Sequence, residues 1–312
     1  MHPALPAEVL ERGTVCCIGV FDGVHLGHQE LLRATLECAK QKSLHPLVLT
    51  FSNHPLSVLA PPYAPQLLMS AEDKAAMIAT YGVEYVLMVD FTPEFSQTTH
   101  NHFIQRMLMQ NLGMRKVVCG FNFHFGYRAE GDVTYLSKMS EALNFKVDVR
   151  ERVSLRGMTV SSSQIRGLLE RGRVHAAAEM LTRHYRLSGE VVQGEMRGRT
   201  MGYPTANLVV PEERLKPRPG VYAVRVKAGE RCHNGMINIG SSPTFEDRAE
   251  GLEAHLFDFT GDLYGQRIEV EFIERLRETR KFDSIKGLMD QLKMDESAAR
   301  EYLRDLDESE KQ

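Results

Sequence analysis

The sequence lacks the features of several large classes of protein. In its 312 residues no apolar run approaches the roughly 18 consecutive residues that a membrane helix needs. Residues 1–13 show no basic segment followed by a continuous apolar stretch, so no signal peptide is predicted. We therefore expect a cytoplasmic protein without a membrane segment.

Cysteine is scarce, and no two cysteines have the spacing of a zinc or redox motif. The number of cysteines is five, and Cys16 and Cys17 are adjacent in a predicted strand. We expect buried thiols in a reducing compartment, with neither disulfides nor a zinc site. A basic excess is also missing, because 38 Lys and Arg stand against 41 Asp and Glu, a net charge of -3. No nucleic-acid partner is predicted.

The chain has an ordinary globular composition, and its length favours two domains. In the first half, short apolar segments alternate with helical ones. The predicted strands are 15–20, 46–51, 85–91, 116–121 and 145–153, and the predicted helices are 29–40, 71–81, 100–112 and 133–143, with more helix from 161 to about 183. This alternation predicts a parallel sheet with helices on both faces and a ligand crevice beyond the carboxyl ends of the strands.

From about Leu187 the pattern changes to closely spaced strands. They are predicted at 189–192, 206–210, 221–227, 235–239, 252–259 and 267–276. Such spacing is typical of a small antiparallel barrel. Apolar residues at helical spacing over 284–306 predict a C-terminal helix that covers one face of the barrel. We predict domains at residues 1–183 and 184–312.

The segment GVFDGVHLGH, residues 19–28, lies between a predicted strand and a predicted helix. Its glycines let the backbone approach a phosphate, and the helix N-terminus offers unpaired N–H groups. His25 and His28 are three residues apart, so they share a helix face and can donate hydrogen bonds to a polyphosphate. The same spacing suits an exposed helix face or half of a metal site, although no third ligand lies nearby in the sequence.

Four segments together resemble the flavin-nucleotide branch of the HxGH nucleotidyltransferases, whose signature is GxFDGxHxGH. Besides residues 19–28 they are TFSNHP at 50–55, GFNFHFG at 120–126 and SSSQIR at 161–166. The resemblance implies a Rossmann-like nucleotidyltransferase domain that adenylylates FMN to FAD and releases pyrophosphate. Ser163, Asn53 and His124 stand where the family usually has Thr, Pro and Arg.

This resemblance also implies the site residues of the first domain. His25 and His28 would bind ATP phosphates and stabilise developing charge, so they are predicted to be catalytic. The further residues predicted to bind ATP are Gly19, Phe21, Asp22, Gly23, Asn122, Ser162, Ser163 and Arg166. His54 and Phe125 are predicted to bind the flavin. No protein nucleophile is needed, because the FMN phosphate can attack the α-phosphate of ATP in line.

A second glycine-rich segment, GRTMGYPTAN at 198–207, leads into a strand of the predicted barrel. Backbone N–H groups of such a loop can contact phosphate, and Thr205 and Asn207 offer hard oxygens that suit Mg²⁺, although a plain hairpin loop has the same composition. The segment resembles the GRxxGxPTAN signature of riboflavin kinases. The family's later segments follow in order: GVYAV at 220–224, NIGSSPTF at 238–245, EAHLFDF at 253–259 and DLYG at 262–265.

The second resemblance implies a six-stranded riboflavin kinase barrel that transfers the γ-phosphate of ATP to the riboflavin 5′-hydroxyl. Glu253 matches the family's general base, although spacing alone does not exclude the nearby carboxylates of Asp258, Asp262 and Glu269. The residues predicted to bind ATP are Gly198, Arg199, Gly202, Thr205 and Asn207, of which Thr205 and Asn207 also bind the metal. Those predicted to bind flavin are Asp262, Tyr264 and Arg277.

Together the two resemblances predict a bifunctional enzyme of flavin nucleotide biosynthesis. Riboflavin, FMN and ATP are its expected substrates, FMN and FAD its products, Mg²⁺ its cofactor, and a monomer or weak oligomer its expected state. Two alternatives stay open. One is a monofunctional riboflavin kinase with a degenerate or differently specific nucleotidyltransferase domain, and the other is a flavin-sensing or RNA-binding regulator.

Overall fold

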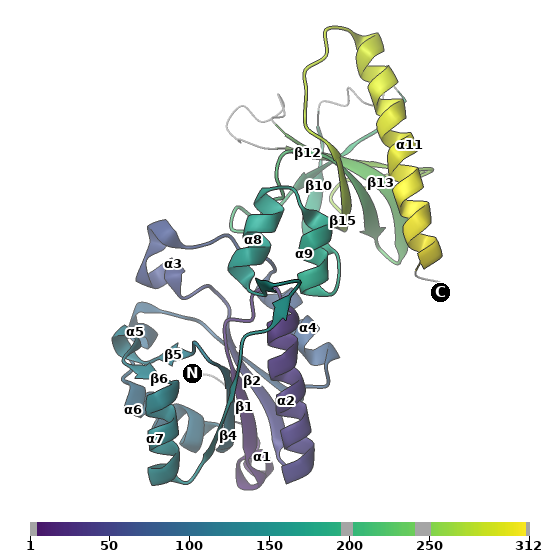
Figure 1. Cartoon of the computed structure of the whole chain (residues 1–312). Helices are drawn as coiled ribbons and strands as arrows, with labels where there is room; N and C mark the ends of the chain where they lie inside the picture. The colour runs from purple at the N-terminus through teal and green to yellow at the C-terminus, as the bar shows by residue number, and fades with distance from the viewer. Residues whose placement is uncertain (1–4, 195–201, 241–250, 310–312) are drawn as a thin grey trace. The chain divides into compact units, whose positions relative to one another are not determined.

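The computed structural model describes residues 5–194, 202–240 and 251–309, and the chain forms two compact units, Met1–Ser162 and Ser163–Gln312 (Figure 1). The second unit includes helix α8 (Ser162–Glu170) from Ser163 on, and helix α9 (Val174–Leu181). The boundary between these compact units lies earlier in the chain than the predicted domain boundary at 183/184. The predicted domain division stays a prediction. None of the described helices has the length and apolar character needed to cross a membrane.

A five-stranded parallel sheet forms the centre of the first unit, as the alternation of segments predicts. Its order is β3-β2-β1-β4-β7, made of β1 (Thr14–Ile18), β2 (His45–Phe51), β3 (Tyr85–Val89), β4 (Met114–Gly120) and β7 (Lys146–Arg150). Strand β1 pairs with β2 on one side and with β4 on the other. The strand order therefore reverses between β1 and β4, and ligands of such sheets bind beyond the carboxyl ends at this point.

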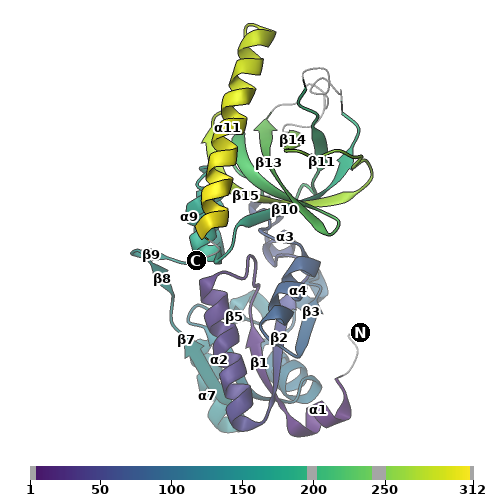
Figure 2. The same cartoon turned by 90° about the vertical axis from the view of Figure 1, so that its right-hand side faces the viewer.

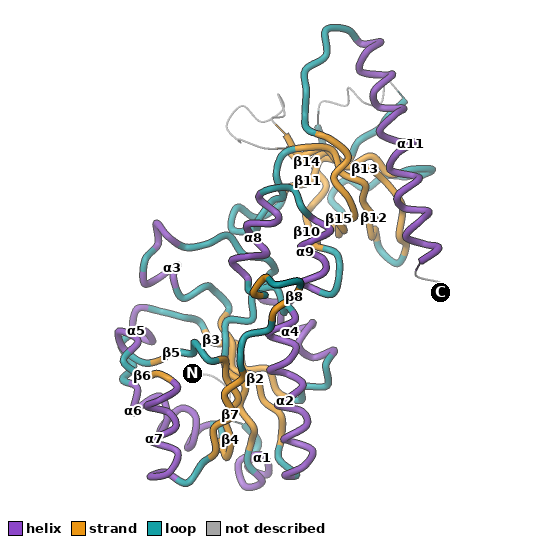
Figure 3. The backbone as a smooth tube through the Cα atoms, viewed as in Figure 1, coloured by secondary structure: helices purple, strands orange, loops and turns teal. Residues whose placement is uncertain are grey.

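Helices cover both faces of this sheet, which Figure 3 shows as orange strands between purple helices. Helices α2 (Leu26–Lys42) and α4 (Ala71–Thr80) pack on one face. The other face carries α6 (His100–His102), its π-helical continuation η2 (Phe103–Asn111), and α7 (Val133–Leu143). The predicted helix at 100–112 is therefore confirmed in place, but most of it has π rather than α geometry.

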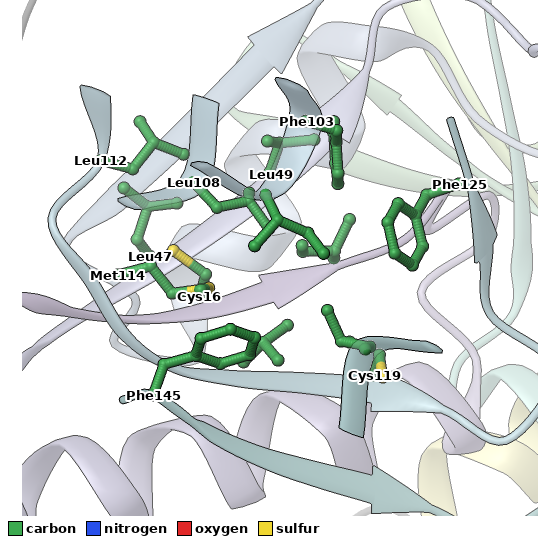
Figure 4. Packing of buried hydrophobic residues seen from close by; sticks show 14 of the residues in the cluster. Cys16, Leu47, Leu49, Phe103, Leu108, Leu112, Met114, Cys119, Phe125 and Phe145 are labelled. Atoms are coloured by element: carbon green, nitrogen blue, oxygen red, sulfur yellow. The ribbon is translucent and has the colours of Figure 1, made fainter. Parts of the chain in front are cut away.

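Alternation along β1 sends neighbouring side chains into two different cores. Cys16 packs with Phe103 and Leu108 on the η2 face (Figure 4). Cys17 packs on the α2 face. Burial raises the pKa of both thiols to about 12, so they stay neutral. All five cysteines are free, and the expectation of buried thiols is confirmed for all except Cys232, which is exposed.

Polar side chains fix where several helices begin. Ser70 Oγ accepts a hydrogen bond from the Asp73 N–H at 3.0 Å, which confirms the predicted helix start. The Asp132 carboxylate accepts from the Tyr135 N–H at 2.7 Å. The remaining short elements of this unit are α1 (Ala7–Arg12), α3 (Leu56–Leu59), η1 (Pro61–Tyr63), α5 (Pro93–Ser96), β5 (His124–Phe125), η3 (Tyr127–Ala129), β6 (Gly131–Asp132), β8 (Ser154–Leu155) and β9 (Met158–Thr159).

The second unit is a closed six-stranded antiparallel barrel with a C-terminal helix, as predicted (Figure 2). Its order is β10-β11-β14-β13-β12-β15, made of β10 (Tyr185–Val192), β11 (Ala206–Val209), β12 (Gly220–Ala228), β13 (Arg231–Gly240), β14 (Gly251–Leu256) and β15 (Arg267–Arg277). Helix α11 (Ile285–Ser309) packs Ala299 and Leu303 against Ala223 and Met236 of the barrel. Helix α9 contacts β10 and β15.

A buried ion pair anchors α11 to the end of β15. Arg277 donates from Nε and Nη2 to both carboxylate oxygens of Asp295 at 2.7 to 3.0 Å, and the Gln291 amide donates to the same carboxylate at 2.7 Å. Asp295 is 3% exposed. A charge so deeply buried needs these donors, and removing one partner of such a pair is costly.

We expect Asp295→Ala to lower the free energy of unfolding of the second unit by about 3 kcal/mol, because it leaves a partly buried guanidinium without its carboxylate. Hydrogen exchange followed by mass spectrometry tests this, since amides of β15 and α11 should exchange faster. Amides of the first unit serve as the internal control. Unchanged exchange in β15 and α11 would contradict the anchoring role of the pair.

Candidate functional site

The loop of residues 19–25 joins β1 to α2 at the carboxyl edge of the parallel sheet. His25 caps α2, since its Nδ1 accepts a hydrogen bond from the His28 N–H at 3.4 Å. The two imidazole rings stack with centroids 3.7 Å apart and an angle of 14° between their planes. The shared face predicted for these histidines is thus confirmed, and their role at a phosphate stays a prediction.

The same loop has an unfavourable backbone conformation. Phe21 and Val24 have φ angles of 55° and 40°, in the left-handed region that costs a residue with a side chain of order 1–2 kcal/mol. Surrounding groups hold the loop in place. The buried Asp22 carboxylate accepts from the Leu68 N–H at 2.9 Å, and the Gln29 amide donates to the Val24 carbonyl at 3.0 Å. The fold therefore pre-organises this loop.

Two further predicted ATP-binding residues lie at the same edge of the sheet. Asn122 follows the end of β4, the parallel neighbour of β1, so it lies beside the strand-order reversal. The Ser162 hydroxyl donates to the Asp22 carbonyl at 2.8 Å, so Ser162 lies beside the loop. Ser163 and Arg166 follow in the first turns of α8.

Two departures from the family pattern make local contacts. The Asn53 side chain donates to the Phe91 carbonyl at 2.9 Å and accepts from the Phe91 N–H at 2.8 Å, so it ties the segment after β2 to the segment after β3. His124 Nδ1 lies 3.0 Å from the Asn122 carbonyl oxygen. Both residues therefore brace segments that follow strands of the sheet.

The predicted flavin residues of this unit differ in their surroundings. His54 Nδ1 accepts from the Leu56 N–H at 3.2 Å, where α3 begins. Phe125 is buried in the core near Phe103 (Figure 4). Its ring centroid lies 5.4 Å from the ring centroid of Phe103 and 5.4 Å from that of Phe123. The structure thus gives Phe125 a packing role, and flavin contact at either residue stays a prediction.

In the barrel, strand register brings three polar residues side by side. Glu253 on β14 is directly opposite Asn207 on β11 and Asn238 on β13. Residues directly opposite in antiparallel strands share a face, with Cβ atoms about 5 Å apart. We call Asn207, Glu253 and Asn238 the polar row. Asn238 lies in the NIGSSPTF segment, for which no site role is predicted. The sequence signal that could have identified it is its place between two apolar residues of β13, Ile237 and Ile239, which are buried.

The three competing carboxylates make contacts away from Glu253. Asp258 receives two hydrogen bonds from Arg300 at 2.9 and 3.1 Å, and these bonds lower its pKa. Glu269 on β15 lies 3.3 Å from Arg186 Nη1. Asp262 accepts the Tyr264 N–H at 2.9 Å in a turn. Each of the three is engaged in a contact outside the polar row.

The segment before β11 is anchored to its surroundings. His255 Nδ1 hydrogen-bonds the Pro204 carbonyl at 2.8 Å, and the Tyr203 ring lies 5.0 Å from the His255 ring. These contacts fix the chain on the N-terminal side of Thr205. Gly202, just before them, has a φ of 79°, which favours glycine. The predicted ATP residues Gly198 and Arg199 lie outside the described residues.

The donors around the polar row fit Mg²⁺. Hydroxyl, amide and carboxylate oxygens from Thr205, Asn207 and Glu253 are hard ligands, and Mg²⁺ typically takes few protein ligands beside phosphate and water. Gly194 leaves room for this donor set, because a Cβ there would lie 2.2 Å from Asn207 Nδ2. Across the described ranges no group of three or more His, Cys, Asp or Glu is placed to hold a metal, as a full protein cage would require.

Comparison with known proteins assigns an activity to each unit. The family model of FAD synthetase matches residues 8–164, and that of riboflavin kinase matches residues 181–303. These matches define an enzyme with a nucleotidyltransferase unit of Rossmann-like topology and a kinase barrel. The chain belongs to the family of bifunctional riboflavin kinase/FMN adenylyltransferases.

Relatives of this name match the chain almost end to end. The protein of Listeria monocytogenes is 35% identical over 309 residues, which cover 98% of each chain, and that of Bacillus subtilis is 35% identical with 98% and 97% covered. The Escherichia coli K12 protein is 36% identical with 95% of each covered. A crystal structure named as a macrolide-efflux protein from Streptococcus pneumoniae is 32% identical, with a TM-score of 0.84 and 92% and 94% covered. This similarity supports the fold of both units.

We expect Gly194→Ala to lower riboflavin phosphorylation by about 10- to 100-fold, because its Cβ would displace the Asn207 amide from the polar row. FMN formation measured by chromatography tests this, and FAD formation from supplied FMN should not change. Gly287→Ala in α11 is the matched control, since Gly287 has no left-handed φ and its Cβ would come no nearer than 3.3 Å to another residue, at Ser284 Oγ. Wild-type phosphorylation by Gly194→Ala would contradict the expectation.

Proposed function

We propose that residues 184–312 of this bifunctional enzyme phosphorylate riboflavin to FMN and that residues 1–183 adenylylate FMN to FAD. The observation that carries this division is the presence of two differently built sites. One is the loop with stacked His25 and His28 at the strand-order reversal, and the other is the polar row of the barrel. Each lies in the part of the chain matched by the corresponding family model.

In the adenylyltransferase unit, the N-terminus of α2 and its two imidazoles are proposed to bind the triphosphate of ATP. The hydrogen bond from the His28 N–H to His25 Nδ1 assigns the proton of a neutral His25 ring to Nε2, which is the nitrogen proposed to donate to phosphate. Donors held in place stabilise charge that develops on the α-phosphate and on the leaving pyrophosphate. The FMN phosphate then attacks in line without a protein nucleophile.

In the kinase unit, Glu253 is proposed to accept the proton of the riboflavin 5′-hydroxyl during phosphoryl transfer. Asn207 and Asn238 are its direct partners on the two neighbouring strands. Thr205 and Asn207 are proposed to hold Mg²⁺, which when bound neutralises charge on the phosphates of ATP. The flavin contact proposed for Tyr264 is supported by its 46% exposure, whereas the Arg277 guanidinium is engaged with Asp295.

The substrates proposed are small molecules, and the balanced charge gives no basic excess for a nucleic-acid partner. We propose action in the cytoplasm as a monomer or weak oligomer. The direct test is a time course of the purified protein with riboflavin, ATP and Mg²⁺, in which riboflavin, FMN and FAD are separated by chromatography. FMN that appears and then becomes FAD supports both steps, and flavin binding without turnover contradicts them.

His28→Ala should lower FAD formation from FMN by roughly 10²- to 10³-fold, because it removes a donor at the developing charge. FMN formation by the same variant should match the wild type, which shows that the barrel unit is unaffected, and an unchanged melting temperature of the first unit shows that this unit is folded. His45→Ala is a control at the opposite edge of the sheet, where His45 Nδ1 lies 2.6 Å from Glu84, and it should leave both rates unchanged. Equal loss of both activities in His28→Ala would contradict the two-site division.

Glu253→Gln should lower riboflavin phosphorylation by about 10²- to 10⁴-fold, since an amide does not accept the hydroxyl proton. FAD formation from supplied FMN should be unaffected. Glu269→Gln removes another barrel carboxylate, one paired with Arg186, and should keep phosphorylation within a few-fold of wild type. If Glu269→Gln loses more activity than Glu253→Gln, the general base is assigned to the wrong residue.

A further inference from the structure

A buried lysine on α4 contacts the loop of residues 19–25 from within the fold. Lys74 is 6% exposed, and its Nζ donates to the Val20 carbonyl at 3.0 Å and to the Phe51 carbonyl at 2.5 Å. Val20 belongs to the loop after β1, and Phe51 is the last residue of β2. One ammonium group therefore links the carboxyl ends of two neighbouring strands at the edge that carries the adenylyltransferase site.

The loop needs such a contact because it holds Phe21 and Val24 in left-handed conformations. Such conformations persist where surrounding groups over-determine them. The Val20 carbonyl, next to Phe21, also accepts the Thr50 hydroxyl at 2.9 Å. Two donors thus converge on one peptide oxygen of the loop, and one of them is charged and gives the stronger hydrogen bond.

Burial of an ammonium costs free energy, and an apolar side chain of similar length would fill the same space without that cost. Burial lowers the pKa of Lys74 to about 8, and the nearby Asp22 carboxylate opposes this effect. Asp22, in the loop itself, is the charged group that faces the ammonium, while β2 contributes the Phe51 carbonyl and the Thr50 hydroxyl. The charge at this position therefore indicates a role beyond packing.

We propose that Lys74 is a positioning residue for FMN adenylylation: its ammonium holds the Val20 carbonyl, and with it His25, where the loop can receive the phosphates of ATP. This inference rests on the adenylyltransferase function proposed for the loop. Lys74 does not touch the reacting atoms in this role. It acts through the backbone that carries the phosphate-binding groups.

The proton on Lys74 gives the role a pH dependence. Above about pH 8 the lysine becomes neutral, so its bonds to the two carbonyls weaken and its attraction to Asp22 is lost. FAD formation should therefore fall as the pH rises through about 8. Stability should not fall with it, because the folded pKa lies below that of the unfolded chain, so loss of this proton favours the folded state as the pH rises.

The test compares Lys74→Met, Lys74→Arg and wild type in both activities of the full chain. Lys74→Met should lower kcat/KM for ATP in FAD formation by roughly 10²-fold, the cost of a small misplacement of binding groups. Riboflavin phosphorylation should be unchanged. Lys74→Arg keeps a permanent charge and several donors, so it should retain most of the activity and lose the fall near pH 8.

Lys116→Met is the matched control. Lys116 lies near the amino end of β4, at the edge opposite the loop, and pairs with Asp148 at 2.8 Å. Its removal should leave the kinetic constants of adenylylation unchanged. If Lys74→Met fails to fold, the pH profile of Lys74→Arg decides, since a fall near pH 8 that persists in this variant would overturn the proposal.

Two other outcomes have distinct meanings. FAD formation at the wild-type rate by a folded Lys74→Met protein overturns the positioning role and leaves the proposed function intact. A wild-type chain that forms FMN but no FAD overturns the proposed adenylyltransferase function, and the role of Lys74 with it. Melting temperatures of each variant accompany the kinetics, because a purely structural lysine would change stability without changing kcat/KM below the melting range.

Discussion

Backbone pairing between strands determines which side chains meet in both sites. In the first unit all five strands run parallel, so the loop after β1 and Asn122 after β4 reach the same edge although about 100 residues separate them. In the barrel, antiparallel register places Glu253 between Asn207 and Asn238. A shift of one residue in either pairing would turn Glu253 to the other face. The chemistry therefore depends on the register.

Holding the loop of residues 19–25 in a fixed conformation costs folding free energy in the first unit. Left-handed Phe21 and Val24 are unfavourable, and so is the burial of Lys74. Their combination is understandable if the loop must present N–H groups and imidazoles to a triphosphate before the substrate arrives. The contacts of Asp22 with Leu68 and of Ser162 with the Asp22 carbonyl act in the same direction. The unfavourable conformations and the buried charge therefore reduce the stability of the fold at the loop where the phosphate is expected to bind.

Much of the fold could be predicted from periodicity, because the strands and helices of both units have clear apolar patterns. The π geometry of Phe103–Asn111 could not, since it leaves the apolar pattern close to that of an α-helix. The order of the motifs along the chain identifies Glu253 as the predicted general base. No motif predicts the ion pair of Arg277 with Asp295, because this pair depends on how α11 packs. Lys74 was missed for a similar reason. A lysine in an amphipathic helix normally lies in solvent, and only tertiary structure shows that this one is buried.

Two of the buried charged residues, Lys74 and Asp295, have a common position relative to the sheets. Lys74 binds carbonyls at the carboxyl ends of β1 and β2, and Asp295 binds the arginine that ends β15. Hydrophobic residues at these positions would leave strand ends free to adjust, because apolar contacts have little directionality. A charged hydrogen bond specifies distance and direction. Charged hydrogen bonds are therefore found at the strand ends, where the position of the following segment must be fixed. In the middle of each sheet, apolar packing is sufficient.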